Sequence, residues 1–195
     1  MNRRTLLHGI AALAALPLLP ACSQASPGTN AASATAQGSA AAKSAAGSSG
    51  ANQSMGEVKM LDVPHSYWRD KVSPAAYEVL FDEDTEVAFS SPLDKEKRDG
   101  TFVCAACQLP LFDSTTKFDS GTGWPSFTAP IAGRMGTKRD FKLIWPRTEY
   151  HCARCGGHQG HVFDDGPAPR GERWCNNGLA LAFVPQGQPL PALRG

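Results

Sequence analysis

The chain has 195 residues, is 42% hydrophobic and carries a net charge of +1. A charge this close to zero gives no reason to expect binding to nucleic acid, or to a membrane surface through a basic patch. Composition shifts along the chain, and only about 140 residues are expected to fold as a domain, which is enough to bury a hydrophobic core.

Residues 1–22 have the features of a targeting segment. The basic pair Arg3-Arg4 precedes an apolar run from Ile10 to Leu19 that is too short to span a bilayer comfortably. The run closes in Leu19-Pro20-Ala21-Cys22, which resembles a bacterial lipobox. We therefore expect a signal peptide, lipidation of Cys22 and a lipid-anchored protein of the bacterial cell envelope that faces the periplasm and touches the membrane only through its anchor.

Two alternatives remain for this segment. The Arg3-Arg4 pair resembles a twin-arginine export signal, although Asn2 stands where Ser or Thr is usual. An ordinary secretory signal with a cysteine beside its cleavage site is the other alternative. Ser23 follows Cys22 in place of the Asp that retains Gram-negative lipoproteins at the inner membrane, which indicates the outer membrane in such a host.

Residues 23–56 are mostly Ala, Ser and Gly, with Lys43 as the only charged side chain and no aromatic residue. A segment without an apolar stripe cannot bury enough surface to fold. We expect a flexible tether with a reach on the order of 30 Å. The folded domain is then expected over residues 57–195.

The domain is expected to begin with a helix and to continue with short strands. Ser73-Pro74 is a helix start, with an N-cap residue followed by proline at the first helical position. The charged run 94–99 indicates solvated surface, and Trp68 and Trp145 are expected in the core. Strand patterns, separated by Gly and Pro, cover residues 101–103, 141–145, 149–152, 160–163 and 179–184. These patterns predict a mainly β fold, with antiparallel sheets in a small sandwich or barrel-like core and short N-terminal helices.

Two CxxC pairs, Cys104/Cys107 and Cys152/Cys155, form short knuckles. Four thiolates in this arrangement are what a tetrahedral zinc site requires, so a structural Zn²⁺ is predicted. Disulfides are the alternative, because an exported protein meets an oxidising compartment. Disulfides within each CxxC would close tiny loops and stabilise little, whereas crossed pairing between the two knuckles stays possible. His151 and His158 lie near in sequence, but four thiolates already complete the tetrahedron.

A fifth cysteine of the domain, Cys175, follows Arg173-Trp174 and precedes Asn176-Asn177. A positive neighbour lowers the pKa of a thiol, so Arg173 is expected to favour the reactive thiolate. On a strand, Arg173, Cys175 and Asn177 would share one face. An inert buried cysteine is the structural alternative.

Three motifs join the cysteine pairs: Gly121-Thr122-Gly123-Trp124-Pro125-Ser126-Phe127, the segment 157–166 with His158 and His161, and the segment 173–177. With these motifs the chain, from about Tyr67 to Val184, resembles the B-type methionine sulfoxide reductases. The resemblance implies a peptide-methionine (R)-S-oxide reductase that repairs oxidised proteins or peptides. Its cysteine nucleophile, here Cys175, would pass through a sulfenic acid.

The resemblance also implies roles for the other residues. The histidines at 158 and 161 would line the site, with His158 favoured as the proton donor. Asp165 would organise the polar network and Asn177 would hydrogen-bond within the site. Trp124 would form the apolar wall for the substrate's S-methyl group.

Thr122 occupies the position at which many members of this family carry a resolving cysteine. The sulfenic acid on Cys175 would then be reduced by an external thiol, such as a thioredoxin-like envelope protein. An unlipidated Cys22, carried by the tether, is the intramolecular alternative. Two other functions stay open: a zinc-ribbon-like binding module without catalysis, and a thiol–disulfide exchanger that uses a CxxC pair.

Overall fold

The computed structural model of the chain describes residues 58–142 and 145–195. The predicted signal peptide, the lipidation site Cys22 and the tether lie outside the described residues. Within those residues, no helix is long and apolar enough to cross a membrane.

A helical N-terminal part precedes the sheets. The 3-10 helix η1 (His65–Trp68) leads to helix α1 (Pro74–Phe81). The hydroxyl of Ser73 accepts a hydrogen bond from the Ala76 amide at 3.2 Å, so the predicted N-cap is confirmed. Trp68 is fully buried and stacks on Phe81 with ring centroids 6.1 Å apart, which confirms Trp68 as a core residue.

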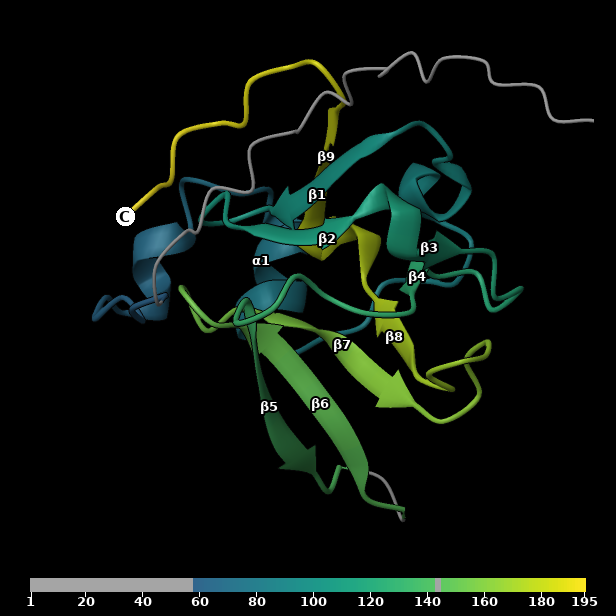
Figure 1. The fold of residues 1–195 in the computed structure, drawn as a ribbon. Coiled ribbons are helices and arrows are strands. Elements are labelled where there is room, and N and C mark those ends of the chain that lie inside the picture. Colours follow the sequence, from purple (N-terminus) through teal and green to yellow (C-terminus); the bar gives the residue numbers. More distant parts are fainter. Residues whose placement is uncertain (1–57, 143–144) are drawn as a thin grey trace, which may run out of the picture. The chain divides into compact units, whose positions relative to one another are not determined.

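Two antiparallel sheets follow (Figure 1). The three-stranded sheet has the order β2-β1-β9, with β1 (Gly100–Cys104), β2 (Pro110–Asp113) and β9 (Leu181–Pro185). The six-stranded sheet has the order β3 (Lys117–Phe118), β4 (Ser126–Phe127), β8 (Arg173–Asn176), β7 (His158–Phe163), β6 (Arg147–Cys152) and β5 (Met135–Asp140). Short 3-10 helices connect strands: η2 (Pro92–Lys95), η3 (Ser114–Thr116) and η4 (Gly178–Ala180). The mainly β prediction is confirmed, and in the described part of the chain the sheets do not close into a barrel.

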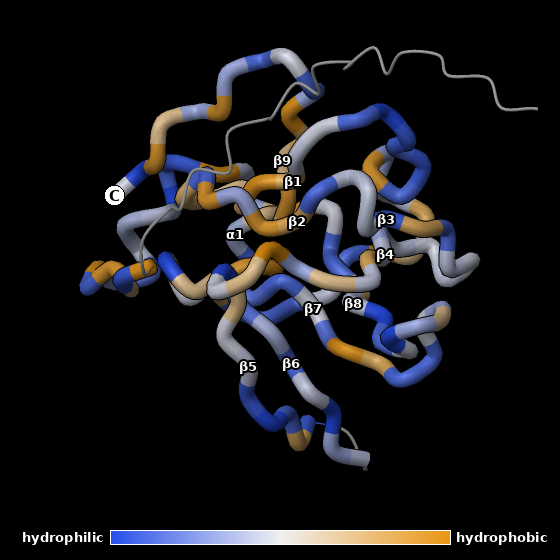
Figure 2. The backbone as a smooth tube through the Cα atoms, in the orientation of Figure 1, coloured by the Kyte–Doolittle hydropathy of each residue, from blue (hydrophilic) through white to orange (hydrophobic). Residues whose placement is uncertain are grey.

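Aromatic side chains join the two sheets. Phe127 of β4 stacks on Phe112 of β2 with ring centroids 4.0 Å apart, and it meets Phe102 of β1 edge-on at 5.0 Å. Phe112 also contacts Tyr150 of β6. In Figure 2 strands β1 and β9 are largely hydrophobic, whereas β5 and β6 are mostly hydrophilic. The core therefore lies between the sheets, and the β5–β6 hairpin projects from it.

The structure corrects the expected strand at 141–145. The described residues of this segment belong to the connection between β5 and β6, and Phe141 and Trp145 are 72% and 80% exposed. The prediction of Trp145 as a core residue is wrong, because the connection lies at the far end of the projecting hairpin. The charged run 94–99 also departs from a wholly solvated surface, since Asp94 is buried within η2.

Candidate active site

Strand β8 places Cys175 in the middle of the six-stranded sheet. Cys175 pairs with Ser126 of β4 on one side and with His161 of β7 on the other. The neighbouring glycine of β7, Gly160, permits this approach, because a Cβ at that position would lie 1.9 Å from the Cys175 carbonyl oxygen. Two flanking strands therefore fix the backbone of Cys175.

The half-buried thiol of Cys175 opens onto a cavity of about 120 Å³. Four residues singled out in the sequence meet in its wall: Cys175, His161, Asn177 and Trp124. The remaining lining residues are Thr85, Arg147, Gly160, Phe163 and Asn176. His158, Asp165 and Arg173 do not line the cavity, although Arg173 and Asp165 act directly on the Cys175 thiol.

Opposing effects set the pKa of Cys175. Burial raises the pKa of the thiol, while the nearby Arg173 guanidinium and a hydrogen bond from Thr122 act in the opposite direction. Burial is the larger effect. Arg173 therefore lowers the pKa of Cys175 as expected, but the net pKa is still raised. Asp165 binds Arg173 through two hydrogen bonds of 2.7 and 2.9 Å, and its negative charge adds to the rise in the pKa of Cys175.

Arg173 also touches the cavity indirectly. Its guanidinium carbon lies 4.3 Å from the ring centroid of Phe163, which is a cavity-lining residue. Asp165 thus fixes the Arg173 guanidinium behind one wall of the site.

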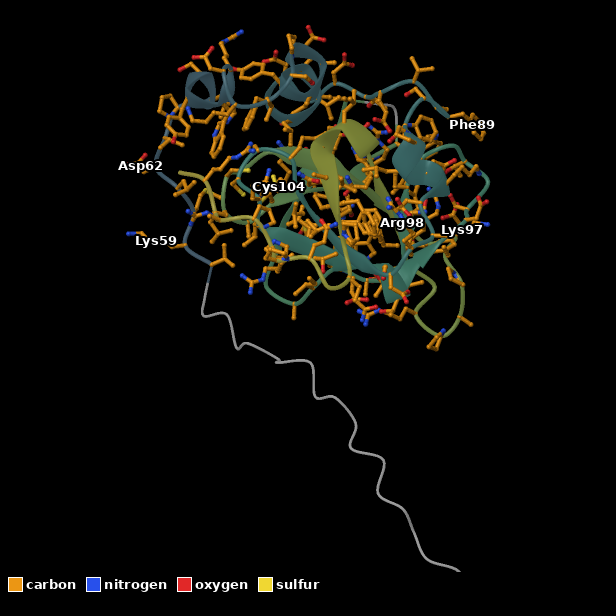
Figure 3. All side chains as sticks on the ribbon, turned by 90° about the horizontal axis from the view of Figure 1, so that it is seen from above. Lys59, Asp62, Phe89, Lys97, Arg98 and Cys104 are labelled. Carbon is orange, nitrogen blue, oxygen red and sulfur yellow. The ribbon has the colours of Figure 1, made fainter. Side chains whose placement is uncertain are left out.

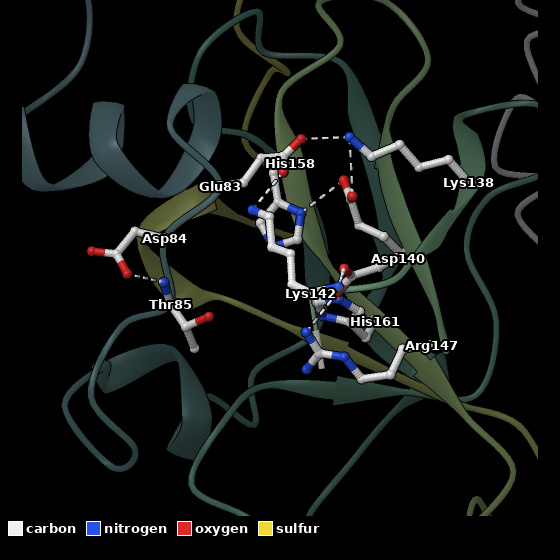
Figure 4. A network of polar contacts seen from close by, with 10 residues as sticks. Glu83, Asp84, Thr85, Lys138, Asp140, Lys142, Arg147, His158 and His161 are labelled. Atoms are coloured by element: carbon white, nitrogen blue, oxygen red, sulfur yellow. Dashed lines mark hydrogen bonds and ion pairs between the residues drawn. The ribbon is translucent and has the colours of Figure 1, made fainter. Parts of the chain in front are cut away.

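His161 is the titratable imidazole in the cavity wall, and two residues that the sequence did not suggest hold it. Its Nε2 lies 2.8 Å from Oδ2 of Asp140, and Arg147 donates to the same oxygen at 2.6 Å (Figure 4). Burial lowers the pKa of His161 although Asp140 opposes that change, so the ring is neutral near pH 7. Hydrogen bonds from the Lys142 amide, His161 and Arg147 lower the pKa of Asp140, so it is a carboxylate.

His158 has its own ionic contacts, which Lys142 links to those of His161 by bonding both Glu83 and Asp140. The Nδ1 of His158 is 2.9 Å from Oε1 of the buried Glu149, and Lys138 lies 3.1 Å from the other carboxylate oxygen of Glu149. The rings of His158 and His161 meet edge-on with centroids 5.4 Å apart. Figure 4 shows both imidazoles within this network.

Glu86, also absent from the sequence prediction, ties the other wall together. Its carbonyl accepts a hydrogen bond from the Trp124 indole at 3.2 Å, and its amide donates to the Asn177 side chain at 3.1 Å. The buried Glu86 carboxylate accepts from the amides of Gly178 and Leu179 at 2.7 and 2.8 Å. These contacts orient the tryptophan and the asparagine towards Cys175.

The two CxxC pairs converge as predicted. Cys104 and Cys152 end strands β1 and β6, and Cys107 and Cys155 lie in the turns that follow. The four buried sulfur atoms lie within 4.8 Å of one another, with Cys104–Cys155 and Cys107–Cys152 distances of 3.6 and 3.5 Å. A disulfide requires about 2.05 Å, so these sulfurs are not paired covalently. Tetrahedral coordination at about 2.3 Å gives sulfur–sulfur distances near 3.8 Å, so the cluster fits a four-thiolate metal site.

Gln159 connects this cysteine cluster to the catalytic strand. The side chain is fully buried, its amide nitrogen lies 3.8 Å from Sγ of Cys104, and its amide oxygen accepts from Asn176 at 3.3 Å. The residue next to the nucleophile is therefore two hydrogen bonds away from a cysteine of the cluster.

Comparison with known proteins places this geometry in a family. Residues 72–185 match the SelR domain, and this match covers both the cysteine cluster and the cavity. The chain belongs to the SelR family, that of the B-type methionine sulfoxide reductases. The resemblance seen in the sequence motifs is thereby confirmed.

Curated relatives carry the corresponding names. The chain is 47% identical over 130 residues to peptide methionine sulfoxide reductase MsrB of Pseudomonas putida (strain W619), covering 66% of this chain and 98% of that protein. It is 48% identical over 120 residues to MsrB of Bradyrhizobium diazoefficiens, covering 61% and 86%. The chloroplastic peptide methionine sulfoxide reductase B1 of Arabidopsis thaliana is 48% identical over 115 residues, and the chain spans 57% of its length.

Proposed function

We propose that this chain reduces methionine-R-sulfoxide in proteins or peptides, with Cys175 as the nucleophile. The observation that carries the proposal is the shared cavity, in which a half-buried thiol faces an imidazole, an indole and an amide. Membership of the SelR family supports the same reaction.

The reaction transfers one oxygen atom and two electrons. The Cys175 thiol gives its proton to His161 as its sulfur bonds to the sulfoxide sulfur, and His161 passes that proton to the sulfoxide oxygen. The hydroxyl then moves from the substrate sulfur to the Cys175 sulfur as the sulfur–sulfur bond and the substrate sulfur–oxygen bond break. Cys175 is left as a sulfenic acid, and the substrate leaves as methionine. Trp124 supplies the apolar wall against which the S-methyl group packs.

The position of His161 in the cavity wall favours it over His158 as the proton donor. His158, held by Glu149 and in ring contact with His161, instead supports the orientation of His161. The sequence analysis favoured His158 as the proton donor, and that assignment is untested. One measurement distinguishes it from the assignment to His161. Replacement of the donor lowers the rate of the chemical step at saturating substrate more than replacement of its neighbour does.

The sulfenic acid on Cys175 is reduced by an external thiol. Thr122 lies beside Cys175 as a hydrogen-bond donor where a resolving thiol would be needed, and the other described cysteines are those of the metal cluster. A thioredoxin-like envelope protein or a small dithiol fits this requirement. A Cys22–Cys175 disulfide in the oxidised enzyme, detected by mass spectrometry, would contradict this part of the proposal.

The cluster of Cys104, Cys107, Cys152 and Cys155 would hold a structural Zn²⁺. Four thiolates leave no open coordination position, so the ion would cross-link the knuckles and would not touch substrate.

The N-terminal sequence supports a place in the bacterial envelope. Cys22, lipidated and left as the new N-terminus, would anchor the chain, and residues 23–56 would tether the domain on the periplasmic side. The outer membrane is the favoured location in a Gram-negative host. The enzyme would then repair oxidised methionines in envelope proteins.

The deciding experiment is epimer-resolved reduction of a methionine sulfoxide peptide with dithiothreitol, together with a metal count. We expect reduction of the R epimer alone, and its complete loss in Cys175→Ser with zinc and fold retained. A folded, zinc-loaded wild type without activity on either epimer would instead support the zinc-ribbon-like binding module. Stoichiometric zinc in the freshly purified protein argues against a CxxC exchanger, because the metal occupies those sulfurs.

A further inference from the structure

The cavity above Cys175 is small. Its volume is about 120 Å³, which suits the sulfoxide end of one methionine side chain. The polypeptide on either side of this methionine must therefore lie outside the cavity, against its rim.

One stretch of the rim exposes apolar side chains. Thr85 lines the cavity, and the two residues at alternating positions beyond it, Val87 and Phe89, are 77% and 65% exposed. Figure 3 shows Phe89 at the outer edge of the domain. The intervening Glu86 points inward and is buried. The segment thus runs from the cavity wall to the surface with its apolar side chains facing out.

Hydrogen bonds hold the backbone that exposes these side chains. Glu86 holds the segment by hydrogen bonds to Trp124, Asn177 and the two residues that follow Asn177. The Phe89 amide donates to the Gly123 carbonyl at 2.7 Å. Phe89 itself has a φ of +65°, a conformation that costs energy for a bulky residue.

Phe89 is also continuous with the substrate wall. Its ring lies so close to Gly123 that a Cβ there would be 2.7 Å from the ring, and Gly123 directly precedes Trp124. A surface that starts at Thr85, passes Val87 and ends at Phe89 is therefore joined to the cavity at both the threonine and the tryptophan.

We propose that Val87 and Phe89 form a docking surface for the polypeptide that flanks the oxidised methionine, an inference that rests on the proposed function. Methionine is among the residues most often buried in folded proteins. A methionine from such a buried region has apolar neighbours in sequence, so the segment that flanks it is apolar and low in charge. Contact with such a segment would remove both side chains from water, which favours binding.

The test compares two substrates under one reductant. The first is a short peptide with apolar residues on both sides of methionine-R-sulfoxide, and the second is N-acetylmethionine-R-sulfoxide, which has no flanking residues. Dithiothreitol serves as the reductant, so docking of a protein reductant does not contribute. Val87→Thr removes apolar surface at constant shape, and Phe89→Asn keeps a residue that tolerates positive φ. Leu190→Asn, at another exposed apolar residue away from the cavity, is the matched control.

The double variant is expected to lose on the order of tenfold in kcat/KM for the peptide, chiefly through KM, because about two side chains no longer bury their apolar surface. For N-acetylmethionine-R-sulfoxide it should stay within about twofold of wild type. Should that substrate turn over too slowly, its inhibition of peptide reduction gives the same comparison. The Leu190 control should match wild type on both.

Equal losses on both substrates, or unchanged kcat/KM for the peptide, would overturn the docking proposal. Val87→Thr alone controls for a folding defect, because an exposed isosteric change leaves the fold intact. It should show a smaller loss of kcat/KM, for the peptide only. Failure of the proposed function would look different, since wild type would then reduce neither substrate.

Discussion

At the scale of single residues, Cys175 illustrates how the site balances two demands. The thiol must be shielded to receive a sulfoxide, and shielding raises its pKa. Arg173 supplies a compensating positive charge, but Asp165 neutralises part of it. The resting enzyme therefore keeps Cys175 largely as a thiol near neutral pH, and the proton needed by the sulfoxide oxygen is already in the site.

Replacement of Arg173 by Gln should make this thiol less reactive. The pKa of Cys175 is already raised, so its alkylation by iodoacetamide is slow at neutral pH and increases as the pH rises towards that pKa. Without the guanidinium the pKa rises further, and the alkylation rate at pH 7 should fall by about three- to tenfold. Arg170→Gln removes an exposed charge and is the control. A profile that moves to lower pH would contradict the assigned role of Arg173.

Individual site residues could be predicted where they belong to a short sequence motif. Trp124, His161, Cys175 and Asn177 meet in one cavity, as the motifs suggested, because each motif carries its own turn or strand. Asp140 and Glu86 were not anticipated. Asp140 of β5 comes close to His161 of β7 because both strands pair with β6. Glu86 hydrogen-bonds to residues 91 to 93 positions later in the chain. Contacts of that range leave no pattern in a single sequence.

At the scale of elements, the pairing of β7 with β8 positions the nucleophile. Gly160 faces Asn176 in this pairing, and its lack of a side chain lets the Cys175 carbonyl approach. Because the obstructing atom belongs to the backbone, no side-chain rotation can relieve a clash at this position.

Gly160→Ala should therefore separate β7 from β8. We expect a loss of about 1–3 kcal/mol in the free energy of unfolding and a larger loss of sulfoxide reduction, because Cys175 moves relative to His161. Denaturant unfolding and single-turnover reduction measure the two effects. Gly136→Ala in β5 is a matched change, since the atoms nearest its Cβ would belong to the movable ring of His151. Wild-type activity in Gly160→Ala would show that the register tolerates a side chain.

Strand prediction from clusters of β-branched and aromatic residues succeeded for some segments and failed for others. The strands around Phe102, Tyr150 and Val162 were anticipated. The hydrophilic β5 (Met135–Asp140) was not, because it is held by its pairing with β6 and not by a buried face of its own. A strand was expected just after β5, although its described apolar residues, Phe141 and Trp145, are exposed.

At the scale of the whole domain, the four-cysteine cluster joins the two sheets. Cys104 ends a strand of the smaller sheet and Cys152 ends a strand of the larger one. A bound metal would therefore hold the two sheets together at one point. The exposed rim at Val87 and Phe89 has a different role, since it would contact substrate.

Removal of the metal should destabilise the whole domain. Thiolate coordination contributes directly to folding free energy, so a strong chelator is expected to lower Tm by roughly 10 °C or more. Sulfoxide reduction should fall in parallel and should return when Zn²⁺ is added back under reducing conditions. Circular dichroism melts with a metal count are the measurement. An unchanged Tm in verified metal-free protein would exclude a structural role for the cluster.

The amide of Gln159 bears on the order in which this protein matures. One end of that side chain contacts a knuckle sulfur and the other contacts the residue that follows the nucleophile, although these partners are 55 and 17 positions away in the chain. The contact with Cys104 can form once Gln159 has been synthesised, whereas the contact with Asn176 must wait until the chain has been synthesised through Asn176. The link between the first knuckle and the strand of the nucleophile is consequently completed late in biogenesis.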